Sequence, residues 1–292
     1  MVLTLLVVQC SSITNMKKKT LDIQGHRGTR GHMPENTIPA FIKAVDMGVT
    51  TLELDLAVTK DHQLVVSHEP YFGAHISIDS TGRPISPNDE LAHNIYTMTY
   101  QQVATYDVGS KFHERFPDQM KMKVSKPLFK EVVDSVSRYC RAHGLADMRY
   151  NIEIKSLPEG DDKFHPTPDV FSQLVYGFIK ENMEMSLVNV QSFDFRILQY
   201  FHQHFPEIVL AVLIENEQSI DENLTNLGFV PEIYSCDYTL LDQSKVDYLH
   251  DQGMRVIPWT VNNENDIREV ISWRIDGIIS DYPDRVIKAI SE

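Results

Sequence analysis

The stretch Leu52-Glu53-Leu54-Asp55-Leu56 alternates apolar and acidic residues, which is the pattern of a β-strand whose two faces differ. On such a strand the two carboxylates point to the same side. Residues 150–155 repeat the pattern and place Asn151, Glu153 and Lys155 on one face. Acids at buried positions are costly unless they share a cation or a partner. Two such strands therefore predict a hard oxygen site for Mg²⁺ or Ca²⁺, made by Glu53, Asp55 and Glu153. An edge strand with a solvated polar face is the alternative.

Strands and helices alternate on both sides of this stretch. Their short connections predict a parallel sheet covered by helices. Eight or nine strands over this length favour a closed (β/α)8 barrel over an open doubly wound sheet. The predicted strands are Leu21–Gln24, Thr51–Val58, Gln63–His68, Arg149–Lys155, Leu187–Ser192, Val209–Glu215, Glu232–Cys236, Arg255–Val261 and Gly277–Ser280. The predicted helices are Thr37–Met47, Leu128–His143, Asp169–Glu181, Asp194–Phe205, Asp242–Asp251 and Glu264–Trp273.

Two parts of the chain depart from a simple alternation of strands and helices. Thr51–Val58 and Gln63–His68 are separated by a turn only, so they form either a hairpin or two successive barrel strands. The segment from Tyr71 to Ser125 has no strong period, and a connection of that length in a compact domain is usually a functional insertion. We expect it to cap the cleft of a single domain spanning residues 21–292. Asn36 is the expected N-cap of the first helix.

Composition limits the classes of function. The chain has 292 residues, of which 42% are hydrophobic and 23% are charged, and its formal net charge is −14. An acidic surface argues against broad nucleic-acid binding, which depends on phosphate neutralisation. The sequence contains no apolar run long enough to span a bilayer. The hydrophobic and charged fractions are ordinary for a soluble globular enzyme.

The three cysteines form no disulfide framework. Cys140 and Cys236 lie in regular patterns and are interpreted as packed thiols. Cys10 ends a short apolar run and precedes two serines, which resembles a bacterial lipoprotein signal within residues 1–20. This predicts a periplasmic protein or a membrane-anchored lipoprotein with a lipid on Cys10. The run lacks a basic start, so a cytoplasmic location is the alternative.

Two histidines stand out because each ends a predicted strand. His26 follows the first strand and is succeeded by Arg27, and His68 ends the third. Catalytic residues of barrels lie at such carboxyl-terminal strand ends. Two histidines can act as acid and base near pH 7, and Arg27 offers a bidentate fork to a phosphoryl oxygen. Other histidines, His113 among them, are interpreted as structural.

Further strand ends carry weaker signals. Gln191-Ser192-Phe193 ends one strand, and Trp259 ends another, where it either walls the cleft or packs in the core. Asp281-Tyr282-Pro283 ends the last strand and is interpreted as a turn.

Together these motifs resemble the glycerophosphodiester phosphodiesterase family, in the family's order from about Gln24 to Pro283. The motifs are His26-Arg27-Gly28, Pro34-Glu35-Asn36-Thr37, Glu53-Leu54-Asp55, Ser67-His68-Glu69-Pro70, Asn151-Ile152-Glu153-Ile154-Lys155, Gln191-Ser192-Phe193, Trp259-Thr260-Val261-Asn262 and Asp276-Gly277-Ile278-Ile279-Ser280-Asp281-Tyr282-Pro283.

The resemblance implies a TIM barrel with a capping insertion that hydrolyses glycerophosphodiesters to sn-glycerol 3-phosphate and an alcohol, in glycerophospholipid breakdown. It implies a divalent metal on the three carboxylates, His26 and His68 as the acid–base pair, and phosphate contacts from Arg27 and Lys155, with Trp259 beside the substrate. In the family's route the glycerol 2-hydroxyl attacks phosphorus, and water opens the resulting cyclic phosphate. We expect His68 to act first as base.

One residue departs from the family pattern. Glu69 follows the second histidine where the family usually has Asp, which puts the rate in doubt more than the reaction class. A lysophospholipid or a phosphoinositide head group is the alternative substrate. A binding module without activity is disfavoured because every ligand and both histidines are present. A glycosidase is disfavoured because its chemistry needs an acid pair without a cationic clamp.

Overall fold

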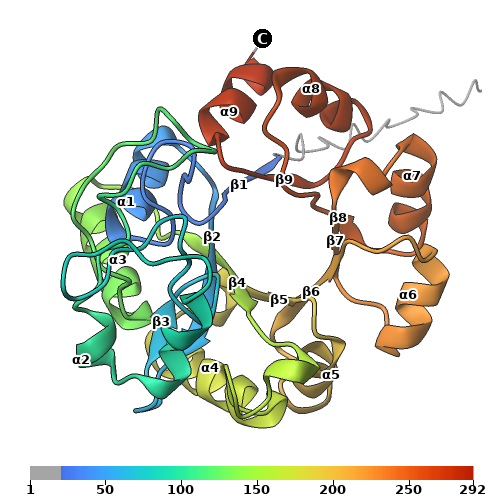
Figure 1. The fold of residues 1–292 in the computed structure, drawn as a ribbon. Coiled ribbons are helices and arrows are strands. Elements are labelled where there is room, and N and C mark those ends of the chain that lie inside the picture. The colour runs from blue at the N-terminus through green and yellow to red at the C-terminus, as the bar shows by residue number, and fades with distance from the viewer. Residues whose placement is uncertain (1–20, 292) are drawn as a thin grey trace, which may run out of the picture.

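The computed structural model describes residues 21–291, and over this range eight parallel strands form a barrel seen along its axis in Figure 1. The strand order is β8-β7-β6-β5-β4-β2-β1-β9. Backbone hydrogen bonds from Asp276 N to Val256 O (2.9 Å) and from Ile279 N to Pro258 O (3.0 Å) join the two ends of this order. The predicted (β/α)8 barrel is confirmed. Its strands are β1 (Asp22–Gly25), β2 (Thr51–Val58), β4 (Arg149–Ile154), β5 (Val188–Ser192), β6 (Val209–Ile214), β7 (Ile233–Cys236), β8 (Arg255–Val256) and β9 (Gly277–Ser280).

The ninth strand, β3 (Leu64–Val66), is not part of the barrel. It pairs antiparallel with β2, with Leu56 opposite Val66 and Val58 opposite Leu64. The hairpin alternative for these two segments is therefore correct. The hairpin carries His68 back toward the end of β2, where the acidic residues lie.

The predicted strand Arg255–Val261 is longer than the observed β8, which ends at Val256. Pro258 lies in the missing part and has no amide hydrogen to donate to a sheet ladder. The chain nevertheless continues beside β7, because Ile257 N donates to Tyr234 O (3.1 Å) and Trp259 N donates to Cys236 O (3.1 Å).

Helices surround the barrel (Figure 1), and three of the described helices, the one-turn α2 as well as α6 and α9, are absent from the predicted set. Signals for α6 and α9 are present in the sequence, because Ser219 and Glu222 form a capping box at the start of α6 and Pro283 begins α9. The helices are α1 (Ile38–Met47), α2 (Tyr100–Val103), α3 (Phe129–Ala142), α4 (Pro168–Asn182), α5 (Phe195–His204), α6 (Ile220–Leu227), α7 (Gln243–Asp251), α8 (Glu264–Ser272) and α9 (Pro283–Ser291). Short 3₁₀ turns lie at Glu90–Ala92, Ile95–Thr97, Pro158–Gly160, Met185–Leu187 and Tyr238–Leu240.

The expected N-cap of α1 was wrong by one residue. Thr37, not Asn36, caps the helix, and its hydroxyl accepts from Ala40 N. Asn36 has a positive φ of 56° and donates its side-chain amide to Asp55 Oδ2 at 2.8 Å. The residue that sequence reasoning gave to the helix therefore belongs to the carboxylate site.

The two faces of β2 explain how the barrel is stabilised. Leu52, Leu54 and Leu56 are fully buried and join the large cluster between the strands and the helices. At about 1.5–3 kcal/mol for each fully buried side chain, this outer layer supplies most of the driving force. The opposite face of β2 points into the barrel and carries Glu53 and Asp55. These two buried positions are therefore acidic rather than apolar.

The segment of residues 71–125 has a small apolar core of its own, although it has little regular structure. Phe72, Ile76, Ile95 and Val103 are buried in a cluster with Val65 of the hairpin. In Figure 1 this segment lies over β3, α1 and α3 on one side of the barrel opening. Its packing on the hairpin places it beside His68.

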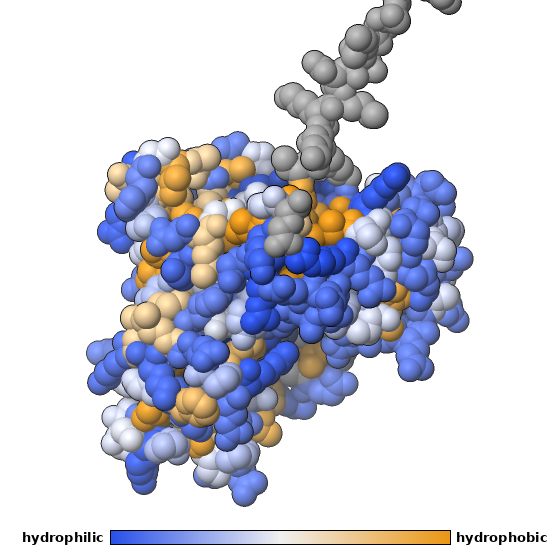
Figure 2. All heavy atoms as spheres, turned by 90° about the horizontal axis from the view of Figure 1, so that it is seen from above, coloured by the Kyte–Doolittle hydropathy of each residue, from blue (hydrophilic) through white to orange (hydrophobic). Residues whose placement is uncertain are grey.

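Two of the three cysteines lie within the described residues. Cys140 and Cys236 are free and buried, as predicted. Cys10 lies outside the described residues. None of the helices within residues 21–291 has the length and apolar character to cross a membrane. The face in Figure 2 is mostly hydrophilic, with hydrophobic side chains in small groups, as the acidic composition leads one to expect.

Candidate active site

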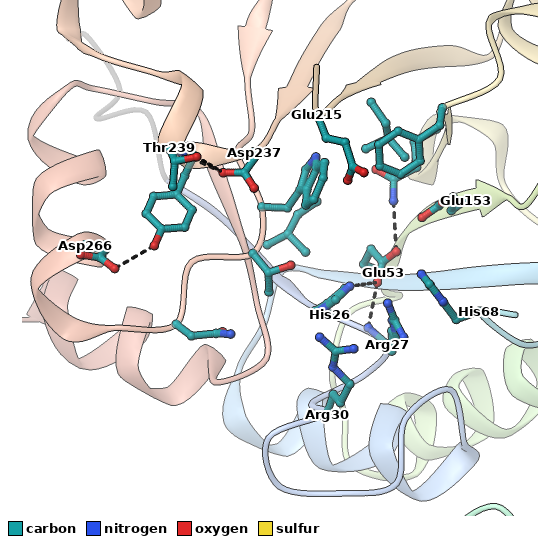
Figure 3. Close-up of a pocket in the computed structure, with 18 of the residues that line it drawn as sticks. His26, Arg27, Arg30, Glu53, His68, Glu153, Glu215, Asp237, Thr239 and Asp266 are labelled. Atoms are coloured by element: carbon teal, nitrogen blue, oxygen red, sulfur yellow. Dashed lines mark hydrogen bonds and ion pairs between the residues drawn. The ribbon is translucent and has the colours of Figure 1, made fainter. Parts of the chain in front are cut away.

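A cavity of about 590 Å³ opens at the carboxyl-terminal end of the barrel. Six of the predicted site residues line it: His26, Arg27, Glu53, His68, Glu153 and Trp259. Figure 3 shows Glu53, Glu153 and the two histidines on one side of this cavity, with Asp237, Thr239 and Asp266 on the opposite side. Asp55 is fully buried beneath, and Lys155 lines an adjoining cavity that shares His68 and Glu153.

Strand pairing brings the three predicted metal ligands together. In the register of β2 and β4, Asp55 is the partner of Glu153. Glu53, Asp55 and Glu153 are all buried, and each offers a carboxylate oxygen within 4.8 Å of the other two. Asp55 Oδ1 is buried without a hydrogen-bond partner. An unsatisfied oxygen among three carboxylates is what a hard divalent cation would satisfy, so the residues present fit such an ion.

Burial and the charges of neighbouring groups shift the pKa values of these three acids. Burial, followed by the charges of Asp55 and Glu153, raises the pKa of Glu53 well above its usual value. Burial and the charge of Asp55 likewise raise the pKa of Glu153, although Lys155 opposes the shift. Burial also acts to raise the pKa of Asp55, but the positive groups of His68, Arg27 and Lys155 outweigh it and lower that pKa. Like charges held this closely favour a cation among them.

Lys155 links the carboxylates to a histidine. Its Nζ lies 2.7 Å from Glu153 Oε1, 3.2 Å from His68 Nε2 and 4.0 Å from Asp55 Oδ1. Burial acts to lower the pKa of Lys155, but the charges of Glu153 and Asp55 raise it, so the side chain is a cation. Because an ammonium has no lone pair, the hydrogen bond to His68 leaves Nε2 of that ring as the acceptor.

His26 is held by a carboxylate from the far end of the chain. Its Nδ1 lies 2.6 Å from Asp281 Oδ1, and its Nε2 lies 4.0 Å from Glu53 Oε2. The positive groups of His26 and Arg30 lower the pKa of Asp281 although burial opposes this, so the carboxylate is an acceptor and Nδ1 donates. Nε2 is therefore the ring nitrogen that faces the acids. Burial lowers the pKa of His26 to about 4, and Asp281 opposes this shift.

His68 has a similar partner one residue away. Its Nδ1 lies 2.7 Å from Glu69 Oε1, so the longer acid that stands in place of the usual Asp still reaches the ring. The second oxygen, Glu69 Oε2, is buried without a hydrogen-bond partner. Two histidine–carboxylate pairs thus flank the three acids from opposite sides.

A tight turn after β1 places Arg27. Arg27 and Gly28 have positive φ values of 50° and 86°, and a Cβ at Gly25 would lie 2.1 Å from Gly28 O. This conformation lets the Arg27 backbone amide donate to Glu53 Oε2 at 2.8 Å. The Arg27 guanidinium donates from Nη1 to Glu35 Oε1 at 2.7 Å, whereas its Nε has no hydrogen-bond partner. Nε lies 3.5 Å from Asp55 Oδ2, so the guanidinium is held between two carboxylates.

Known proteins with the same motifs establish the family. The model of the glycerophosphoryl diester phosphodiesterase family matches residues 26–285. The chain belongs to this family. Glycerophosphodiester phosphodiesterase of Bacillus subtilis (strain 168) is 27% identical over 268 residues, which are 89% of this chain and 83% of that protein. The family member described here is therefore an enzyme of the phosphodiesterase class.

Solved structures agree with the barrel. A crystal structure from Silicibacter pomeroyi DSS-3, assigned as a glycerophosphoryl diester phosphodiesterase, matches with a TM-score of 0.83 and 25% identity over 94% of both chains. An Oleispira antarctica phosphodiesterase in complex with the product sn-glycerol-3-phosphate matches with a TM-score of 0.73 and 20% identity over 93% of this chain and 97% of that one. The second likeness concerns the fold alone.

Several residues of the site were not predicted to take part. Asp281 was interpreted as a turn, yet it holds both His26 and Arg30, with Arg30 Nε 2.8 Å from Oδ1. Its place after the last barrel strand was the available signal. Glu35 was noted only as part of a motif, and Arg30 had no sequence signal of its own. Both are buried because the loop between β1 and α1 folds into the cavity rather than over it.

Aromatic side chains also line the cavity. Trp259 donates from Nε1 to Ser235 O at 3.0 Å and meets Phe193 edge to face, with ring centroids 5.4 Å apart. Trp259 therefore lines the cavity, and the alternative that it only fills the core is wrong. Glu215 points into the cavity (Figure 3) and is a further acid that sequence reasoning did not single out.

Proposed function

We propose that this enzyme hydrolyses glycerophosphodiesters to sn-glycerol 3-phosphate and an alcohol, with a Mg²⁺ or Ca²⁺ ion bound by Glu53, Asp55 and Glu153. The observation that carries the proposal is the set of three buried carboxylates beside two histidine–carboxylate pairs. The family supplies the reaction class, and the site supplies the groups that the reaction needs. The biological role proposed with it is glycerophospholipid breakdown.

The cation would supply charge stabilisation to the phosphoryl oxygens and lower the pKa of an oxygen bound to it. The protein's own part is to keep Asp55 ionised: burial acts to raise its pKa, but His68, Arg27 and Lys155 lower it. Asn36 Nδ2 donates to Asp55 Oδ2 and Gln191 Nε2 donates to Glu53 Oε1, at 2.8 and 3.1 Å, which fixes the orientation of both carboxylates.

Arg27 and Lys155 are the proposed phosphate contacts. Both are cations that line the cavities around the three acids, and Arg27 Nε lies 3.5 Å from Asp55 Oδ2. A guanidinium and an ammonium on a phosphodiester would offset its charge and orient it for attack. Trp259 would then bound the space on the opposite wall.

His68 is the proposed first base. Its Nε2 carries no proton when it accepts the hydrogen bond from Lys155, so it can take the proton of the glycerol 2-hydroxyl. That hydroxyl attacks phosphorus, the bond from phosphorus to the alcohol breaks, and His26 gives the leaving oxygen a proton. A bound anionic phosphodiester would raise the pKa of His26 from about 4. Water then opens the cyclic phosphate with the two roles reversed.

The alternative substrates, a lysophospholipid or a phosphoinositide head group, are not favoured by the bacterial relative, which is named for glycerophosphodiesters. Export and acylation at Cys10 stay a prediction, and intact-mass measurement of the protein from its native host would test it. A mass that retains residues 1–9 and lacks a lipid would count against export.

The test of the proposed function is hydrolysis of glycerophosphocholine and glycerophosphoethanolamine in EDTA, Mg²⁺ or Ca²⁺. We expect metal-dependent release of sn-glycerol 3-phosphate from both substrates, measured with glycerol-3-phosphate dehydrogenase. Full activity in EDTA would refute the metal proposal. Release of glycerol and phosphocholine instead would show that the other phosphoester bond is cut. No release from folded protein would refute the proposed substrate class.

A further inference from the structure

A second group of metal-ligating side chains lies away from the three carboxylates. It consists of Glu35, from the loop between β1 and α1, and of His75 and His113, from the segment 71–125. Each residue offers one donor atom within 4.8 Å of the other two. We propose that Glu35, His75 and His113 bind a transition-metal ion of the Zn²⁺ class, at a site separate from the catalytic carboxylates.

Two of these donors are buried and unsatisfied. Glu35 is 4% exposed and His113 is 7% exposed. Glu35 Oε2 and His113 Nδ1 have no hydrogen-bond partner within the described residues. Glu35 Oε2 lies 3.7 Å from Arg30 Nη1, which is within ion-pair distance but too far for a hydrogen bond. A buried polar atom without a hydrogen-bond partner is unfavourable, and one ion would contact both atoms.

Each histidine ring packs against a neighbouring residue. The ring of His113 packs edge to face against Phe116, with centroids 4.8 Å apart, which fixes it in the interior. His75 is exposed and lies over Gly73, where a Cβ would be only 2.9 Å from His75 Nδ1. The centroids of His75 and His113 are 5.6 Å apart. Because donors around Zn²⁺ lie about 3.4 Å apart, given bonds of about 2.0–2.1 Å, rotation of the exposed His75 can close the set.

The donor types differ from those of the catalytic site. Two imidazoles and one carboxylate suit Zn²⁺ or Co²⁺, whereas three carboxylates suit Mg²⁺ or Ca²⁺. The histidines line a cavity of about 630 Å³ that leaves room for a further ligand such as water. Of the cations around the site, Arg27 lies 2.7 Å from Glu35 Oε1 and Arg30 lies 2.8 Å from Asp281 Oδ1, and Lys111 and Arg115 line the same cavity.

The site would join the segment 71–125 to a phosphate-binding arginine. Glu35 uses Oε1 for Arg27 and leaves Oε2 for the ion, so metal binding need not break the ion pair. The carboxylate would then bridge the ion and the guanidinium, which fixes the position of Arg27 through the segment that carries the histidines. The inference does not depend on the proposed substrate.

Co²⁺ is the probe for the test, since its visible absorption reports on imidazole coordination. The full-length protein is treated with EDTA, dialysed and titrated with Co²⁺ in excess Ca²⁺, which occupies the carboxylate site. We expect one Co²⁺ per chain by equilibrium dialysis, with absorption bands in the visible range. Absence of bound Co²⁺ in Ca²⁺ would overturn the proposal.

Variants separate this site from the other. His75→Ala changes an exposed residue and should lower Co²⁺ affinity at least about tenfold, whereas His143→Ala, at an exposed histidine after α3, should not. Glu53→Gln should leave the Co²⁺ spectrum intact, because Glu53 belongs to the catalytic carboxylates. Equal affinity in His75→Ala and the wild type would refute the assignment, as would loss of the spectrum in Glu53→Gln. Circular dichroism of each variant checks that it is folded.

Discussion

Replacement of Glu53 by glutamine should stabilise the metal-free protein and at the same time weaken its metal site. The side chain is 1% exposed and keeps its volume in the variant. It receives hydrogen bonds from Arg27 N (2.8 Å) and Gln191 Nε2 (3.1 Å), and the amide oxygen can keep one of them. What the variant loses is a negative charge beside Asp55 and Glu153.

The magnitude follows from the spacing of the carboxylates. Two unit charges 4.8 Å apart repel by about 3.5 kcal/mol at an effective dielectric constant of about 20. The raised pKa of Glu53 relieves part of this repulsion, because the folded protein takes up a proton. We therefore expect a gain in the free energy of unfolding of about 1–3 kcal/mol at pH 8 in EDTA, since each pKa unit is worth about 1.4 kcal/mol.

The sign of the pH dependence gives an internal check. Because the pKa of Glu53 is raised in the folded state, the folded protein binds a proton that the unfolded chain has released above about pH 4.5. The free energy of unfolding of the wild type therefore falls as the pH rises above about 4.5. Glu53→Gln has no carboxyl group at this position, so its free energy of unfolding lacks this pH dependence. The advantage of Glu53→Gln should be present at pH 8 and absent at pH 4.5.

Thermal unfolding in EDTA and in Ca²⁺ measures both effects. At about 2–4 °C per kcal/mol for a chain of this size class, Glu53→Gln should unfold several degrees above the wild type in EDTA and gain little from Ca²⁺. Glu181→Gln, at an exposed carboxylate on α4, is the matched control and should behave as the wild type. The reasoning fails if the variant is no more stable in EDTA at pH 8, or if Ca²⁺ stabilises both proteins equally.

Three further predictions concern the reaction. His26→Ala and His68→Ala should each lower kcat about 10²–10⁴-fold, and an activated p-nitrophenyl leaving group should restore His26→Ala far more than His68→Ala. Equal restoration of both would contradict the assigned order of proton transfer. Asp281→Asn should lower kcat, whereas Asp284→Asn, at an exposed acid 2.8 Å from His32, should not; equal effects would show that Asp281 is only structural. A substrate analogue without the glycerol 2-hydroxyl should not be hydrolysed, and its turnover would exclude the cyclic phosphate.

The fold was readable from the sequence because barrel strands and helices have short-range signatures. Alternating acids and leucines in Thr51–Val58 identified the strand that carries the site. The hairpin between β2 and β3 could not be decided, because the period of a strand does not tell whether its neighbour runs parallel or antiparallel. The length of β8 was overestimated because its apolar residues continue past Pro258, where the ladder cannot.

The site was predicted for residues at strand ends and missed where partners come from distant segments. Glu53, Asp55 and Glu153 meet because of the β2–β4 register, which follows from two repeats of one pattern. The contact of Asp281 with His26 spans the chain and depends on barrel closure, which no local pattern encodes. The roles assigned to these residues stay predictions until the variants are measured.

Barrel closure also explains why the last strand matters for an acid–base residue on the first. β9 pairs with β1 in a register that sets Ser280 beside Gly25, so the next residues, Asp281 and His26, must be neighbours. Asp281 is fixed in turn by Asn262, which donates to its Oδ2 at 2.8 Å. Because a misplacement of about 1 Å can cost about 10²-fold in rate, small shifts at the seam between β8 and β9 should reach His26 through Asp281. β8 and β9 are the two ends of the strand order, and the barrel closes where they meet. The same contact sets the position of Asp281 and therefore the geometry of proton transfer at His26.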